Sequence, residues 1–111
     1  MELGISRDEL NIISMNVILH AGNARDLNMS VLDMLAENDK NYIAIEEKIN
    51  SAKKELNEAH KFQTDMIQLE ANDKEVPFSV LLIHAQDTLM TITSEVLMTE
   101  KMVKIFKNKE D

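Results

Sequence analysis

Apolar side chains recur along this chain at spacings of three and four residues, the period of α-helices that bury one face. The polar clusters Glu37–Asp39 and Asn72–Glu75 interrupt this pattern. It therefore predicts three helices, over residues of about 7–37, 40–72 and 77–107. Each is roughly 45 Å long at 1.5 Å per residue. Because the connecting turns are short, we expect an all-α, antiparallel three-helix up-down-up subunit that forms a single domain over residues 1–111.

Residues typical of helix ends support these limits. Ser6 and Glu9 have the spacing of a capping box at the start of the first helix. Asp39 is the expected N-cap of the second helix, and Pro77 suits the first turn of the third, where its missing N–H is harmless. Gly22 lies inside the first helix, where glycine costs about 1 kcal/mol relative to alanine. We expect close contact with another helix to require this small residue.

The third helix has an unusual distribution of polar residues. Between Val80 and Ser94 it carries one formal charge, Asp87, whereas a surface helix shows several over four turns. On a helical projection, a broad apolar arc contains Leu81, Leu82, Ile83, Ala85, Leu89, Met90, Ile92, Val96 and Leu97. The remaining stripe is polar but mostly uncharged and contains Val80, His84, Asp87, Thr88, Thr91, Ser94 and Met98. We interpret this stripe as a second packed surface, buried against another subunit of a symmetric assembly.

Composition limits the compartment and the partners. The chain of 111 residues has no cysteine, which excludes disulfides and thiolate metal sites. A formal charge of −8 argues against nucleic-acid or anionic-membrane partners but is compatible with a basic protein partner. The N-terminus lacks the pattern of a signal peptide, and no apolar segment approaches the roughly 20 residues that span a bilayer. We therefore expect a cytoplasmic protein that does not insert into membranes.

His84 and Asp87 are three residues apart and so share one helical face. One interpretation is a buried histidine that a nearby carboxylate satisfies. The other is a nucleophilic imidazole, because an unperturbed histidine is mostly neutral at pH 7 and can attack a phosphoryl group without a base. A phosphoryl group bound through nitrogen is readily passed on, which suits a carrier.

Asp87 constrains this second interpretation, because a carboxylate one turn away would repel a phosphoryl group. Asp87 must point elsewhere or be neutralised. If the polar stripe lines a symmetry axis, several Asp87 carboxylates converge there at a high electrostatic cost. Either a divalent cation bound by oxygens or a shared proton would relieve this repulsion.

Three segments of the sequence match one family in the same order. The segment Pro77–Thr91 resembles a third-helix signature of the form His-(Ala/Gly)-Gln-Asp-His-Leu-Met, Ile18–Arg25 resembles a first-helix motif, and Ala59–Thr64 resembles a second-helix motif. The family is that of the lactose/cellobiose enzymes IIA of the sugar phosphotransferase system. The resemblance covers the chain from about Leu10 to Phe106.

The resemblance implies a fold, partners and a site. Family members are three-helix subunits assembled as a homotrimer, a nine-helix bundle. The histidine that matches His84 receives a phosphoryl group from the phosphocarrier protein HPr and donates it to a cysteine of enzyme IIB. The aspartate that matches Asp87 meets its symmetry mates on the threefold axis, where a divalent metal ion such as Mg²⁺ can bind. The membrane transporter, enzyme IIC, is a separate subunit.

For several residues of these motifs, the resemblance leaves more than one role open. Thr88 replaces a second histidine that is common in the family, although its hydroxyl can still donate a hydrogen bond. Gln86 and Thr88 in the third-helix motif, and His20 and Arg25 in the first, are candidates to line the cleft or support the phosphate. For His20 we favour a satisfied structural histidine over a place in the cleft, whereas Arg25 is equally interpretable as an ion-pair partner. For His60 we expect a packing or hydrogen-bonding role.

Other classes of function fit less well. A carboxylate-bridged dimetal enzyme needs Glu-x-x-His pairs, but the residues three before His20, His60 and His84 are Val, Asn and Leu. A non-catalytic helical adaptor would not explain a histidine and an aspartate in a nearly uncharged stripe. A histidine-phosphotransfer signalling module would place a basic residue near His84, and none is present. If the protein is an enzyme IIA, the residues of the first-helix motif favour a system for cellobiose or chitobiose over one for lactose, all of them β-disaccharides.

Overall fold

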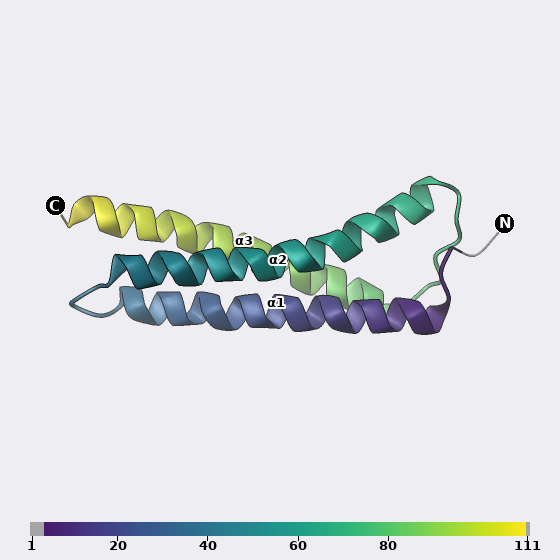
Figure 1. The fold of residues 1–111 in the computed structure, drawn as a ribbon, viewed down its shortest axis with the longest axis horizontal. Coiled ribbons are helices and arrows are strands. Elements are labelled where there is room, and N and C mark those ends of the chain that lie inside the picture. The colour runs from purple at the N-terminus through teal and green to yellow at the C-terminus, as the bar shows by residue number, and fades with distance from the viewer. Residues whose placement is uncertain (1–3, 111) are drawn as a thin grey trace.

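The computed structural model describes residues 4–110, which form a rod of 61 × 20 × 17 Å. Helix α1 spans Arg7–Leu35, α2 spans Tyr42–Ala71 and α3 spans Val80–Lys109. Helices α1 and α2 lie antiparallel, and α3 runs back in the direction of α1 and passes behind α2 in the view of Figure 1. Near the N-terminal end of the rod, α2 diverges from α1 (Figure 1). The predicted all-α, up-down-up subunit is confirmed.

Polar caps set the start of each helix, and two of them differ from the predictions. Ser6 caps α1 as predicted, because its hydroxyl accepts from the N–H of Glu9 at 3.1 Å. Helix α2 is capped by Asn41, whose side chain accepts from Ala44 at 3.2 Å, and not by Asp39. Both residue types cap well, but Asn41 directly precedes the apolar face of α2.

Helix α3 begins three residues later than predicted, so Pro77 lies in the preceding linker and not in the first turn. The cap is Ser79, a preferred N-cap residue, whose hydroxyl oxygen accepts from the N–H of Leu82 at 3.1 Å. The same hydroxyl donates to Asn11 Oδ1 at 3.0 Å and is buried. This bond fixes the start of α3 against the first turns of α1.

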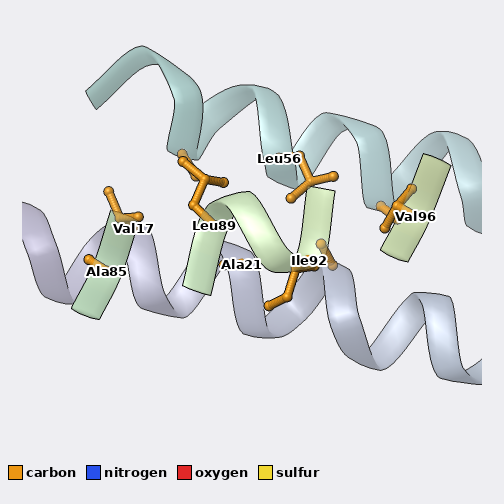
Figure 2. Close-up of a cluster of buried hydrophobic side chains, with 10 residues drawn as sticks. Val17, Ala21, Leu56, Ala85, Leu89, Ile92 and Val96 are labelled. Carbon is orange, nitrogen blue, oxygen red and sulfur yellow. The ribbon is translucent and has the colours of Figure 1, made fainter. Parts of the chain in front are cut away.

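The core lies where one face of each helix meets the other two. Figure 2 shows its central part, in which Leu56 of α2 and Leu89 of α3 lie between the helices with small residues of α1 around them. The buried members of this cluster are Val17, Ala21, Ala24, Ala52, Leu56, Ala59, Ala85, Leu89, Ile92 and Val96. Alanine at five of the ten positions allows the helix axes to approach closely.

The apolar arc predicted for α3 divides between two faces. Its residues Leu89, Ile92 and Val96 are buried, but Ile83, Met90 and Leu97 are 46%, 54% and 53% exposed. The predicted arc was too broad for one core-facing side, since a helix in a three-helix subunit buries a stripe of only about 100°. Over the described residues, no helix is both long and apolar enough to cross a membrane.

Gly22 does not make the close contact predicted for it. A Cβ built at this position would meet no atom of the described residues within 4 Å, the adjacent residues and the local helix backbone aside. The prediction is therefore wrong for contacts within the chain, and the small residue leaves an open spot on the outer side of α1.

A polar cluster joins the end of α3 to the turn between α1 and α2. Lys40 Nζ pairs with Glu110 Oε1 at 2.9 Å and lies 5.8 Å from the centre of the Phe106 ring. The Lys40 ammonium, and after it the neighbouring Tyr42 phenol, hold the pKa of Glu110 below its usual value. Burial of the phenol, and then the neighbouring Glu110 carboxylate, raise the pKa of Tyr42 to about 12.

This cluster predicts an alkaline transition that absorbance can follow, because Tyr42 is the single tyrosine and the chain has no tryptophan. Because the pKa of Tyr42 is higher in the folded chain than in the unfolded chain, the protonated phenol contributes its full stability below the unfolded pKa of about 10. This contribution is lost as the pH rises toward the folded pKa of about 12. Phenolate absorbance should have its midpoint well above pH 10, and Glu110→Gln should lower that midpoint. A midpoint near 10 in the wild type would contradict the burial of this phenol.

Candidate functional site

His84 is the fifth residue of α3 and is exposed. Within residues 4–110 its imidazole forms no hydrogen bond or ion pair, and neither does the exposed carboxylate of Asp87. Within a single chain, the interpretation of His84 as a buried histidine satisfied by a carboxylate is therefore wrong. Its ring nitrogens are available for chemistry.

The helix that carries His84 offers it few charged groups. On α3 the first Lys or Arg is Lys101, more than four turns away. His84 lies one turn from the N-terminus of α3, and helical side chains point back toward that end. The hydroxyl of Ser79 takes one of the first-turn N–H groups. The others form the positive end of the helix dipole, which favours an anion on His84.

Two flanks of α3 face different helices. Gln86, Thr93, Glu100 and Lys107 are spaced seven residues apart and so lie along one flank. The last three all contact α2: Thr93 Oγ1 lies 3.3 Å from His60 Nε2, Lys107 Nζ donates to Glu46 at 3.0 Å, and Glu100 pairs with Lys53. The hydrogen bond of His60 fits the role expected for it. Gln86 therefore belongs to the α2 flank.

The other flank contains His84 and faces α1. Thr88 and Glu95 follow His84 at spacings of four and eleven residues, and Glu95 lies 3.9 Å from Arg25 Nε of α1. Arg25 thus has an acidic partner, one of the two roles considered for it. Thr88 lies one turn after His84 on this flank and is half-buried. His84 and Gln86 are consequently on nearly opposite sides of the helix.

His20 lies in another groove of the subunit. Its Nδ1 is 2.6 Å from Glu55 Oε2 of α2, and Asn23 also donates to that carboxylate at 3.5 Å. The groove beside this pair is lined by His20 and five residues of α2, with none from α3. A single chain therefore does not bring His20 to His84. No spacing of residues along the sequence indicated that Glu55 would be the partner of His20.

Gln86 lines an open groove of about 490 Å³ between the end of α2 and the start of α3. Its other lining residues are mostly apolar: Met66, Ile67, Glu70, Ala71, Val76 and Leu82. Gln86 itself is half-buried, and its amide forms no hydrogen bond among the described residues. The side chain is thus a free donor in an apolar setting.

Between the two flanks, α3 presents an outward seam of residues spaced alternately three and four apart. All of its members are exposed: Val80, Ile83, Asp87, Met90, Ser94, Leu97 and Lys101. This is the a/d spacing of a coiled-coil interface. Asp87 is the single carboxylate in the seam. Within residues 4–110 of one chain, no three His, Cys, Asp or Glu side chains are grouped to hold a metal ion.

The sequence matches the family model described as "PTS system, Lactose/Cellobiose specific IIA subunit" over residues 12–107. The oligo-β-mannoside-specific EIIA component of Bacillus subtilis is 36% identical over 97 residues, which are 87% of this chain and 86% of that protein. The N,N'-diacetylchitobiose-specific EIIA component of Escherichia coli is 34% identical over 84 residues, 76% of this chain and 71% of that protein.

Solved structures agree with this match. PtcA from S. mutans has a TM-score of 0.87 and 34% identity, with coverage of 93% of this chain and 99% of that one. The cellobiose-specific enzyme IIA from Bacillus anthracis has a TM-score of 0.82 and 34% identity, with coverage of 96% and 94%. The family match and the three-helix fold identify a phosphotransferase component. The chain belongs to the lactose/cellobiose-specific IIA family of the phosphotransferase system.

Proposed function

We propose that His84 carries a phosphoryl group from HPr to a cysteine of enzyme IIB, on the cytoplasmic side of the membrane. The observation that carries the proposal is the exposed imidazole of His84, which has no partner among residues 4–110 and lies one turn from the N-terminus of α3. Family membership favours this carrier over a helical adaptor or a signalling module. His20 and His60 are already engaged with Glu55 and Thr93, and are therefore less free to act as nucleophiles.

Each transfer exchanges one bond to phosphorus for another. A lone pair on a ring nitrogen of His84 forms a P–N bond while the bond between phosphorus and the HPr donor breaks and returns its electron pair to that donor. In the second step a thiolate of enzyme IIB forms a P–S bond and the P–N bond breaks. The first-turn N–H groups of α3 stabilise the negative charge in the intermediate state.

We further propose that this phosphoryl group serves the uptake of a β-disaccharide, of the cellobiose or chitobiose kind more than lactose. Relatives are named for lichenan, oligo-β-mannoside and diacetylchitobiose as well as for lactose. The relatives named for oligo-β-mannoside and diacetylchitobiose are 36% and 34% identical, whereas the lactose-specific ones are 29% and 27% identical.

The working unit that we propose is a homotrimer in which three outward seams of α3 meet around a threefold axis. The seam supports this, because Ile83, Met90 and Leu97 are about half exposed and repeat every seven residues. Asp87 lies in the same seam, so three carboxylates would converge at the axis. Carboxylate oxygens suit a hard cation such as Mg²⁺, which would neutralise their charge, and a shared proton is the alternative.

The carrier role predicts which histidine is labelled. The assay contains HPr, the enzyme that phosphorylates HPr, and phosphoenolpyruvate as the phosphate source. The protein should gain one acid-labile phosphoryl group per chain, and His84→Ala should abolish this label. His20→Ala and His60→Ala are matched controls and should keep the label. Persistent labelling of His84→Ala, or none on the wild type, would sink the proposal.

The proposed meeting of three seams predicts the mass of the assembly and its metal content. Light scattering should report about three times the 12.7 kDa mass of one chain. Asp87→Leu should keep this mass, because it replaces a repelling carboxylate by an apolar side chain, and elemental analysis should find the divalent metal lost. A monomeric wild type would refute the seam, whereas a metal-free trimer would favour a protonated Asp87 cluster.

A further inference from the structure

We infer that the three Lys101 side chains of the trimer bind inorganic phosphate on the threefold axis, at a site remote from His84. This inference rests on the proposed trimer of outward seams and not on the chemistry of His84. Lys101 is exposed in the seam and lies 17 residues after His84, which is about 25 Å along α3 at 1.5 Å per residue. A phosphate ion bound there is separate from a phosphoryl group on His84.

The seam brings the three Lys101 side chains together. Asp87, Ser94 and Lys101 follow one another at spacings of seven residues. Positions with this spacing drift by only about 20° per heptad on a straight helix, so Lys101 faces the same side of α3 as Asp87. Rotation about a threefold axis keeps each residue at one height. In the proposed trimer, three Lys101 ammonium groups therefore converge, as the three Asp87 carboxylates do two heptads earlier.

The outward surface around Lys101 is apolar. Leu97, Met98 and Ile105 lie three or four residues from Lys101 and are 53%, 58% and 53% exposed in the single chain. Lys101 itself forms no hydrogen bond or ion pair within residues 4–110. Packing of the three seams would cover the apolar side chains and hold the ammonium groups close together. Like charges in such a setting are costly unless a counter-charge accompanies them.

The carboxylates of α3 in this half of the helix are engaged elsewhere. From Ser94 to Glu110 each of the three lies beside a cation of α1, of α2 or of the turn between them. The neighbours are Arg25 for Glu95, Lys53 for Glu100 and Lys40 for Glu110. Lys104 lines a groove on the α2 flank together with Glu46 and Glu100, so it has carboxylates near it that Lys101 lacks. In the proposed trimer, the counter-charge for Lys101 is therefore an ion from solution.

Symmetry and charge select the ion. A tetrahedral oxyanion with one bond along the axis presents three equivalent oxygens, one to each ammonium group. Phosphate is multiply charged, and lysine binds it as a point charge through charge-assisted hydrogen bonds. A phosphate monoester shares this chemistry, but its organic group would have to lie on the axis between the packed α3 helices. We therefore assign the site to inorganic phosphate.

Calorimetric titration of phosphate into the wild-type trimer, at constant ionic strength, tests the site. The expected stoichiometry is about one anion per three chains, because the site lies on the axis. Lys101→Met should weaken binding by at least about tenfold, whereas Lys101→Arg keeps the charge and should keep the binding. One anion per chain would place the phosphate within each subunit. That result, or unchanged binding by Lys101→Met, would overturn the inference.

Lys104→Met is the matched control, because it removes an equal charge one turn later, on the α2 flank. It should bind phosphate with the wild-type stoichiometry and nearly the wild-type affinity. Equal losses in Lys101→Met and Lys104→Met would mean that phosphate responds to the overall charge of this end of the rod, which contradicts the assignment to Lys101. Tighter binding of a phosphate monoester than of inorganic phosphate would overturn the choice of ligand.

Thermal unfolding gives an independent measurement. Saturating phosphate should raise the Tm of the wild type by roughly 5 °C and leave that of Lys101→Met unchanged. Without phosphate, Lys101→Met should have the higher Tm, because the converging charges are gone. A lower Tm for this variant would show that Lys101 has a partner within the protein and would contradict the inference. Should Lys101→Met aggregate, Lys101→Gln removes the same charge without adding apolar surface.

The outcomes separate this inference from the proposals before it. If light scattering finds a monomeric wild type, the trimer fails and the Lys101 site fails with it, whatever the labelling of His84. If the wild type is a trimer that is labelled on His84 but binds no phosphate, the Lys101 site alone fails. A trimer that binds one phosphate per three chains but is not labelled would keep this site and remove the carrier role.

Discussion

The structure depends on the fact that α3 has more apolar surface than its own subunit can cover. One face of α3 packs into the core with Leu89, Ile92 and Val96. The opposite face repeats Ile83, Met90 and Leu97 every seven residues and remains about half exposed in the single chain. Burying such a seam contributes roughly 25 cal/mol per Å² of apolar surface. This gain is the driving force on which the proposed trimer depends.

The same seam explains why charge is scarce around His84. In the proposed trimer α3 packs on two faces, and such a helix tolerates few charged residues; Asp87 is the single carboxylate in the seam. His84 stands immediately beside this seam, without a side-chain cation on the first five turns of its helix. Within its own helix, negative charge on a phosphorylated His84 ring would be stabilised by the N-terminus of α3. We regard this weak, mostly neutral set of contacts as suitable for a group that must leave as readily as it arrives.

Sequence reasoning predicted the helices well because their burial has a simple period, and Ser6 with Glu9 gave the start of α1 directly. It failed where two residues cap about equally well, as with Asp39 and Asn41 at the start of α2. It also failed at α3, where Ser79 is the N-cap and Pro77, which was predicted in the first turn, lies before it. The exposure of His84 was not decidable from its own helix, since burial depends on how α1 and α2 pack against α3.

Partners in space were the least predictable part of the site. Nothing in the spacing indicated that His20 would pair with Glu55, thirty-five residues away, or that Arg25 would lie near Glu95. The heptad of Ile83, Met90 and Leu97 was readable in the sequence, but the predicted arc assigned these residues to the core. Gly22 was predicted to contact another helix closely, whereas its surroundings among the described residues of its own chain are open.

The central claim is that His84 carries the phosphoryl group, and the three histidines of this chain allow one direct measurement. Proton–nitrogen correlation spectra of the imidazoles, recorded before and after reaction with phosphorylated HPr, resolve His20, His60 and His84 separately. The account predicts that one ring nitrogen of His84 shifts and gains a coupling to phosphorus, while the His20 and His60 signals show no such coupling. A phosphorus coupling at His20 or His60, or no coupling at any of the three, would contradict it.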